Sequence, residues 1–130
     1  MEKQIEYYEN KLKYETDSWD LFDGLSKNEN IIVVDARAAE AYEREHIPSS
    51  INVSHRLMSE DTTKELDRKA TIVIYCDGIG CNASTKGALN MARLGFQVKE
   101  LIGGLDWWRR DGYATEGKQG RSGKAVVCGC

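Results

Sequence analysis

The sequence lacks the features that would direct it to a membrane or to nucleic acid. No apolar run approaches the roughly twenty residues that a membrane-spanning helix needs, and the opening residues lack the apolar stretch of a secretion signal. The formal net charge is only −3, so neither sign of charge dominates and a nucleic-acid partner is disfavoured. We therefore expect a cytoplasmic protein without a membrane or nucleic-acid partner.

Cysteine occurs four times, and the four copies form two local pairs. Cys76 and Cys81 share a glycine-rich segment, while Cys128 and Cys130 are separated by one glycine. Two local pairs in a reducing compartment point to catalysis, redox exchange or metal binding more than to structural disulfides. Four thiolates can hold zinc, but these spacings differ from the two-residue spacings of zinc ribbons. We expect no metal, and keep a metal-binding module as an alternative.

The apolar pattern predicts one α/β domain, since 130 residues suit a single core. Two continuous apolar runs, 31–34 and 71–75, are typical of strands buried on both faces of a parallel sheet. Helical patterns at 38–44, 61–67 and 84–94 lie between or after them. Weaker strand candidates are 51–53 and 98–101. In such folds the functional site lies at the carboxyl ends of the strands.

Two flanking segments differ from the main domain, which we place at 17–113. Segment 1–16 predicts a helix that packs on the domain through an apolar stripe, followed by a short edge strand. The stripe consists of Ile5, Tyr8 and Leu12. Segment 114–130 has glycine every few residues and no periodicity, which predicts a flexible tail ending in Cys-Gly-Cys.

Cys76 is the strongest candidate for chemistry because of its position. It follows the run 71–75 and precedes a glycine-rich loop and a helix. Such a loop can turn its backbone N–H groups inward as a nest that favours negative charge. We therefore expect a thiol pKa below the free value of about 8.5 and a thiol that a substrate can reach. The alternative is a buried cysteine that acts as a small hydrophobe.

Three separated elements resemble the rhodanese-like sulfurtransferase family. The first is Val-Val-Asp-Ala-Arg at 33–37 with His-Ile-Pro-Ser-Ser-Ile-Asn at 46–52. The second is Tyr75-Cys76 with the loop that follows. The third is Leu-Gly-Phe at 94–96 with the glycine and tryptophan pairs within 101–108. The resemblance covers about 17–112, and its elements occur in the family's order.

The resemblance implies a three-layer α/β/α domain with a five-stranded parallel sheet, and no cofactor. It makes Cys76 the nucleophile that takes sulfur from thiosulfate or a low-molecular-weight persulfide and passes it to a thiol or cyanide. Asp35 and Arg37 are expected to be structural, as an ion pair or a turn-bonding pair behind the site. The persulfide would be held by the backbone amides of Asp77, Gly78, Ile79, Gly80, Cys81, Asn82 and Ala83.

The loop departs from the family pattern in its charge. It contains no cation, and Asp77 adds a negative charge that should oppose a low thiol pKa and weaken attraction for thiosulfate. A neutral or thiol-linked persulfide, or a partner protein, fits as donor at least as well. The sixth position after Cys76 is Asn82, so the arginine that phosphatase relatives use to grip phosphate is missing. A phosphatase or arsenate reductase, and a non-catalytic regulatory module, remain alternatives.

The remaining thiols are candidates for resolving or accepting sulfur. Cys81 can form a disulfide with Cys76, or can simply pack beneath the loop. Cys128 and Cys130 can accept the persulfide sulfur or reduce that disulfide, or can belong to a tail with no specific role. We expect a monomer that uses a small-molecule sulfur donor and a thiol acceptor.

Overall fold

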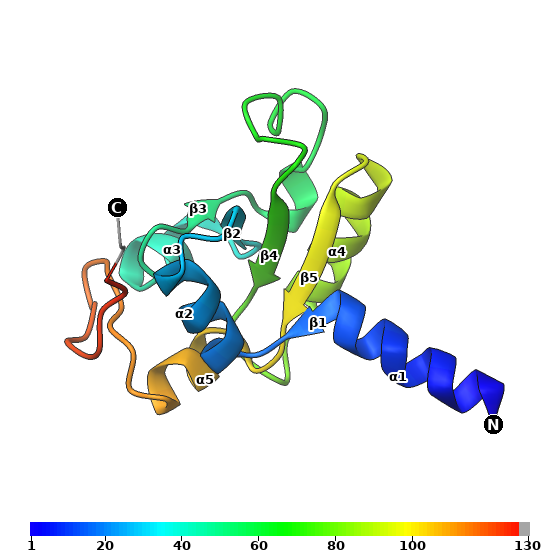
Figure 1. The fold of residues 1–130 in the computed structure, drawn as a ribbon. Helices are drawn as coiled ribbons and strands as arrows, with labels where there is room; N and C mark the ends of the chain where they lie inside the picture. The colour runs from blue at the N-terminus through cyan, green and yellow to red at the C-terminus, as the bar shows by residue number, and fades with distance from the viewer. Residues whose placement is uncertain (128–130) are drawn as a thin grey trace.

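The computed structural model describes residues 1–127, and its centre is a five-stranded parallel sheet in the order β1-β5-β4-β2-β3 (Figure 1). The strands are β1 (Glu15–Thr16), β2 (Ile31–Asp35), β3 (Ile51–Asn52), β4 (Thr71–Tyr75) and β5 (Gln97–Leu101). The helices are α1 (Glu2–Tyr14), α2 (Ser18–Ser26), α3 (Ala39–Arg44), α4 (Ala83–Arg93) and α5 (Gly104–Arg110), with a 3-10 turn η1 (His55–Leu57). The predicted fold class is confirmed.

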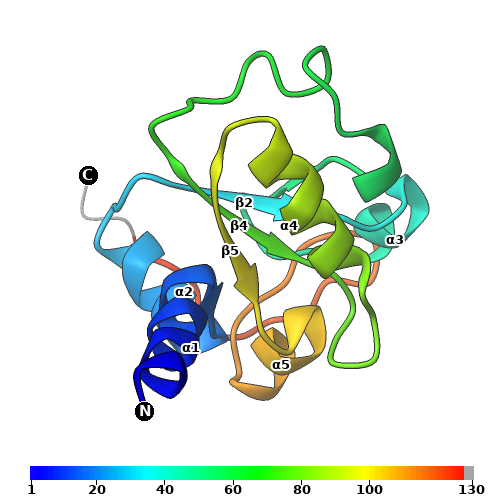
Figure 2. The same ribbon diagram turned by 90° about the vertical axis from the view of Figure 1, so that its right-hand side faces the viewer.

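The sheet separates two apolar cores because successive side chains of a strand point to opposite faces. On one face, Val73 and Tyr75 of β4 pack in the same cluster as Leu105 and Trp108 of α5, and α2 contributes Leu21. On the other face, the cluster contains Ile72 and Ile74 of β4, Met91 of α4 and further apolar side chains. Figures 1 and 2 show α2 and α5 on one side of the sheet and α4 on the other. This layering holds the end of β4 between α4 and α5.

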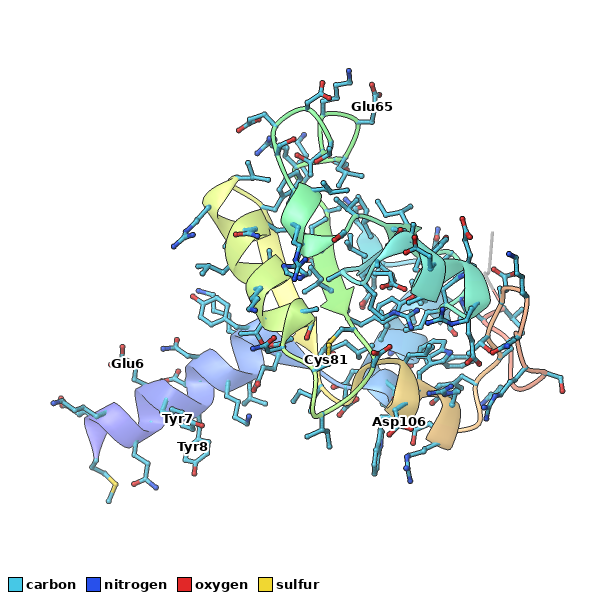
Figure 3. The ribbon with its side chains drawn as sticks, turned by 180° about the vertical axis from the view of Figure 1, so that it is seen from behind. Glu6, Tyr7, Tyr8, Glu65, Cys81 and Asp106 are labelled. Carbon is cyan, nitrogen blue, oxygen red and sulfur yellow. The ribbon has the colours of Figure 1, made fainter. Side chains whose placement is uncertain are left out.

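Helix α1 forms as predicted but does not pack as predicted. None of its residues is buried, and the stripe residues Ile5, Tyr8 and Leu12 are 55%, 55% and 77% exposed. The helix projects from the domain beyond β1 (Figures 1 and 3). No helix within residues 1–127 is both long and apolar enough to cross a bilayer.

The predicted polar helix at 61–67 is wrong, and the segment forms turns. Threonine hydroxyls donate hydrogen bonds to nearby backbone carbonyls, in place of the backbone hydrogen bonds of a helix. The Thr62 hydroxyl donates to the Leu57 carbonyl at 2.7 Å, and the Thr63 hydroxyl donates to the Ser59 carbonyl at 2.7 Å. Ser, Thr and Asp side chains compete in this way with the backbone hydrogen bonds of a helix. The pattern of charged residues at 61–67 does not reveal this competition.

The flexible-tail prediction fails for residues 114–124. The Lys118 amide donates to the Glu43 carbonyl at 3.0 Å and the Gln119 amide to the Arg44 carbonyl at 2.7 Å. The segment also folds back on itself, since the Ala114 amide donates to the Lys124 carbonyl at 3.0 Å. Backbone hydrogen bonds fix it without an apolar pattern that sequence reasoning could detect. Cys128 and Cys130 lie outside the described residues.

Candidate functional site

The candidate site lies at the carboxyl ends of the two strands β4 and β2, which pair in parallel at the centre of the sheet. Asp35 is the last residue of β2, and Cys76 directly follows β4. The loop 77–82 then leads to α4. Figure 3 shows Cys81 on this loop and Asp106 on the neighbouring helix α5. Three elements therefore converge on Cys76, namely β4, α4 and α5.

Helix α5 closes the site from one side through its first amides. The Leu105 amide donates to the Cys76 carbonyl and the Asp106 amide to the Asp77 carbonyl, both at 2.9 Å. This approach requires glycine at Gly104, whose φ is +55°, because a Cβ there would overlap the Cys76 carbonyl oxygen and lie 3.0 Å from the Gly78 nitrogen. Gly104 of the third sequence element thus serves backbone packing against the cysteine loop.

Gly104→Ala is expected to lower the free energy of unfolding by about 3 kcal/mol, because overlap with the Cys76 backbone adds to the strain of a positive φ. Urea denaturation measures the loss. Gly112→Ala is the matched control, since its φ is +86° but no atom lies within 4 Å of the added Cβ. Its loss should be about 1 kcal/mol. Equal losses in the two variants would show that the contact with Cys76 does not matter.

The Cys76 thiol is covered by its own loop. The residue is only 1% exposed, and its Sγ donates to the Cys81 carbonyl and to the Ser84 hydroxyl, each at 3.3 Å. Burial raises the pKa of this thiol above its ordinary value, although the hydroxyl and backbone amide of Ser84 act in the opposite direction. The expected low pKa is therefore wrong for this conformation, because the closed loop removes water from the sulfur.

One of the loop amides predicted to form a nest is engaged elsewhere in this conformation, and the nest as a whole stays a prediction. The Cys81 amide donates to the Gly78 carbonyl at 3.1 Å, so a turn within the loop uses it. The carbonyl of Cys81, not its amide, faces the sulfur. The amide that favours the thiolate belongs to Ser84 in the first turn of α4. The sequence pattern indicated the correct loop but not its peptide orientations.

Titration of the folded protein should show Cys76 ionising above the range of a free cysteine. The raised pKa means that the protonated thiol predominates at neutral pH and that the thiolate appears only as the pH rises further. Ultraviolet thiolate absorbance, taken as the difference from Cys76→Ser, measures this midpoint. The urea-unfolded chain is the control and should titrate near about 8.5. A midpoint at or below that of the unfolded chain would contradict the burial argument.

The predicted ion pair between Asp35 and Arg37 is present and extends to the loop. Arg37 Nη2 lies 2.7 Å from Asp35 Oδ2, and Arg37 Nη1 lies 2.9 Å from Asp77 Oδ1. These carboxylates raise the pKa of the guanidinium against the opposing effect of burial. Asp77 is therefore paired with Arg37, but it shares that one guanidinium with Asp35, so the three groups together keep a net negative charge.

A cavity of about 440 Å³ lies beside the loop, and its lining is acidic. Glu15 and Glu100 contribute carboxylates, and no lysine or arginine is among the lining residues. Ser84 and Thr85 also line it, and both hydroxyls donate to Glu100 Oε2 at 2.7 Å. Sequence reasoning missed Ser84 and Glu100, because they lie 16 residues apart and meet only when β5 pairs with β4.

Metal ligation was an alternative for the four cysteines. Within residues 1–127, no group of three or more His, Cys, Asp or Glu side chains is placed to hold a metal ion. The other two thiols of the four-thiol hypothesis, Cys128 and Cys130, lie outside the described residues.

Known proteins are similar to this chain in sequence and in fold. The model of the Rhodanese-like domain family matches residues 18–111. The thiosulfate sulfurtransferase GlpE of Coxiella burnetii is 31% identical over 111 residues, which cover 84% of this chain and 89% of that protein. An HTH-type transcriptional regulator of Mycobacterium tuberculosis is 36% identical over 87 residues, which cover 66% of this chain and 38% of the regulator. The BH2092 protein of Bacillus halodurans is 47% identical in sequence to this chain. Its crystal structure superposes with a TM-score of 0.87, and the match covers 92% of this chain and 88% of that chain.

Proposed function

Because the chain belongs to the rhodanese-like domain family, we propose that it is a sulfurtransferase in which Cys76 carries sulfur as a persulfide. One observation carries the proposal: the only cysteine at a strand end among residues 1–127 follows the central strand β4, beside the first turn of α4. The likeness to a protein named as a thiosulfate sulfurtransferase supports the same activity. We also propose that the chain acts as a cytoplasmic monomer without a cofactor.

The reaction has two half-reactions that share one intermediate. In the first, the Cys76 thiolate attacks the sulfane sulfur of the donor, the donor's sulfur–sulfur bond breaks, and Cys76 becomes a persulfide. In the second, a thiol or cyanide attacks the outer sulfur, and the Cys76 thiolate leaves. Because Cys76 is 1% exposed, the loop 77–82 has to move before either reagent reaches the sulfur. The closed loop keeps the free thiol protonated between turnovers.

The acidic cavity favours a thiol-linked persulfide over thiosulfate as donor. Thiosulfate is a compact dianion, and the residues that line the cavity include two glutamates, of which Glu15 is paired with Lys11, but no lysine or arginine. Arg37 lies nearby but its guanidinium already serves Asp35, Asp77 and the Glu45 carbonyl. A guanidinium that is fully engaged cannot grip an oxyanion in bidentate fashion. The same lack weighs against phosphatase or arsenate reductase activity.

Intact-protein mass spectrometry after incubation with a donor tests the proposal. We expect glutathione persulfide to add one sulfur to Cys76, and thiosulfate to do so at least about tenfold more slowly because of charge repulsion. Peptide mapping locates the added sulfur. Absence of added sulfur with either donor would overturn the proposed activity, and equal rates would overturn the choice of donor.

A non-catalytic regulatory module is the second candidate. The buried Cys76 and the likeness to an HTH-type transcriptional regulator favour it. Multiple-turnover transfer to a thiol acceptor separates the two functions, since a regulatory module would show no sustained turnover even if the thiol becomes modified.

A further inference from the structure

Two hydrogen bonds connect the Cys76 thiol to a carboxylate in the cavity. Sγ of Cys76 donates to Ser84 Oγ at 3.3 Å, and Ser84 Oγ donates to Glu100 Oε2 at 2.7 Å. Ser84 is 4% exposed, so this connection is shielded along the side of α4 that faces the sheet. At the other end of this connection, Glu100 lines the cavity, where a substrate group can approach it.

The chemistry of the three groups fixes the direction of these hydrogen bonds. An ionised carboxylate only accepts, so the single hydroxyl hydrogen of Ser84 is used on Glu100. The remaining lone pairs of Ser84 Oγ can then only accept, so Ser84 Oγ and the Cys81 carbonyl share the single thiol hydrogen of Cys76. An ionised Glu100 is therefore compatible with a protonated Cys76. A thiolate at Cys76 can accept the Ser84 hydrogen, and a proton that passes from the thiol through Ser84 arrives at Glu100.

We propose that Ser84 and Glu100 form the path by which the proton leaves Cys76 and reaches the departing thiol of the donor. This inference rests on the proposed sulfurtransferase function. Both residues are catalytic in this proposal, since Ser84 touches the reacting sulfur and Glu100 exchanges the proton with the departing thiol. The pair links deprotonation of the nucleophile to the side of the site where the substrate binds.

The path balances for a persulfide donor R–S–SH. The Cys76 S–H proton moves to Ser84 Oγ as the Ser84 proton moves to Glu100, which leaves a thiolate and a neutral carboxylic acid. The thiolate electron pair forms a bond to the outer sulfur of the donor, and the donor's S–S bond breaks to release RS⁻. Glu100 returns the proton to RS⁻, directly across the cavity. The products are RSH and the Cys76 persulfide, and Glu100 is again ionised.

Other charged groups near the path come from three elements. Glu15 of β1 lies opposite Glu100 in the sheet register and is held by Lys11 of α1 at 2.6 Å. Lys11 also interacts electrostatically with Glu100. On the loop side, Cys81 adjoins Cys76, while Asp77 is paired with Arg37. Among the carboxylates of Glu15, Asp77 and Glu100, that of Glu100 is the one that accepts the Ser84 hydrogen bond.

Glu100→Gln and Ser84→Ala test the path because they should shift the thiol pKa in opposite directions. Loss of the Glu100 charge frees the Ser84 hydrogen for the thiolate, so the absorbance midpoint of Cys76 should fall by about one pH unit. Loss of the Ser84 hydroxyl removes the group that lowers the pKa, so the midpoint should rise. In both variants the rate of persulfide formation from glutathione persulfide, corrected to the thiolate fraction, should fall at least about tenfold.

Two matched controls preserve the path. Glu60→Gln removes an exposed carboxylate that pairs with Arg68, and Thr62→Ala removes a hydroxyl that donates to the Leu57 carbonyl; neither residue lines the cavity. Both should keep the wild-type midpoint and corrected rate within about twofold. Thermal unfolding confirms that each variant is folded.

The outcomes separate the path from the proposed function. An unchanged midpoint in Glu100→Gln, or an unchanged corrected rate in either path variant, would overturn the path. The midpoint is read without any sulfur donor. Opposite midpoint shifts in a chain that accepts no sulfur would therefore refute the sulfurtransferase function while retaining the coupling of Cys76 to Glu100.

Discussion

Cys76→Ser is expected to abolish persulfide formation and to lower sulfur transfer by at least about 10³-fold. A hydroxyl in place of the thiol cannot hold sulfane sulfur as a persulfide under these conditions, and it ionises far less readily. The substitution changes one buried atom, so the fold should persist. Intact mass spectrometry with glutathione persulfide measures loading, and a steady-state assay with a thiol acceptor measures transfer.

Cys81→Ser is the matched control for this experiment, since it removes the other thiol of the same loop. It should load sulfur on Cys76 to full occupancy. We propose that Cys81 can resolve the intermediate: its thiol attacks the inner sulfur, a Cys76–Cys81 disulfide forms, and hydrogen sulfide leaves. The persulfide of Cys81→Ser should then decay more slowly than that of the unchanged chain. Loading that survives in Cys76→Ser but disappears in Cys81→Ser would move the sulfur carrier to Cys81.

Cys128 and Cys130 are best tested by substitution with serine, not by deleting the tail. Deletion of the segment from 114 would remove the backbone partners of Glu43 and Arg44 and the Thr115 hydroxyl, which donates to buried Glu45 at 2.6 Å. An effect of deletion would then report on stability. A double serine variant that transfers sulfur at an unchanged rate would exclude these thiols from turnover.

Sequence patterns predicted the sheet because its central strands are apolar on both faces. The runs 31–34 and 71–75 became β2 and β4, which adjoin each other at the centre of the sheet. The position of Cys76 followed from β4, and Gly95 ends α4 with a φ of +94°, as expected for a glycine after a helix. These features depend on local composition, which a single sequence displays directly.

Other features arise only from contacts between distant residues. Glu100 lies next to Ser84 because β5 pairs with β4. The apolar pattern of β5 is weak, so the sequence alone does not predict this contact. The segment after α5 is fixed by backbone hydrogen bonds to Glu43 and Arg44, which no side-chain pattern encodes. The thiol pKa depends on whether the loop covers the sulfur, since burial raises it. Residue types alone therefore gave the wrong direction for that pKa.

Arg37→Met is expected to lower the free energy of unfolding by about 3–5 kcal/mol, because it leaves a buried carboxylate without its partner. Asp35 is 0% exposed, and Arg37 reaches it through Nε and Nη2 at 2.7–3.1 Å. Urea denaturation measures the loss. Asp77→Asn is the control, since Asp77 shares Arg37 but its side chain is 71% exposed, and its loss should stay below about 1 kcal/mol.

The double variant Asp35→Asn with Arg37→Met should recover part of the lost stability, because it removes the unpaired charge along with its partner. Failure to recover any stability would show that shape, not charge, makes Arg37 important. Arg37 also holds Asp77, the first residue of the loop that covers Cys76. Its removal should therefore loosen the loop as well, so Cys76 should react with a thiol-specific reagent faster in Arg37→Met than in the unchanged chain under native conditions.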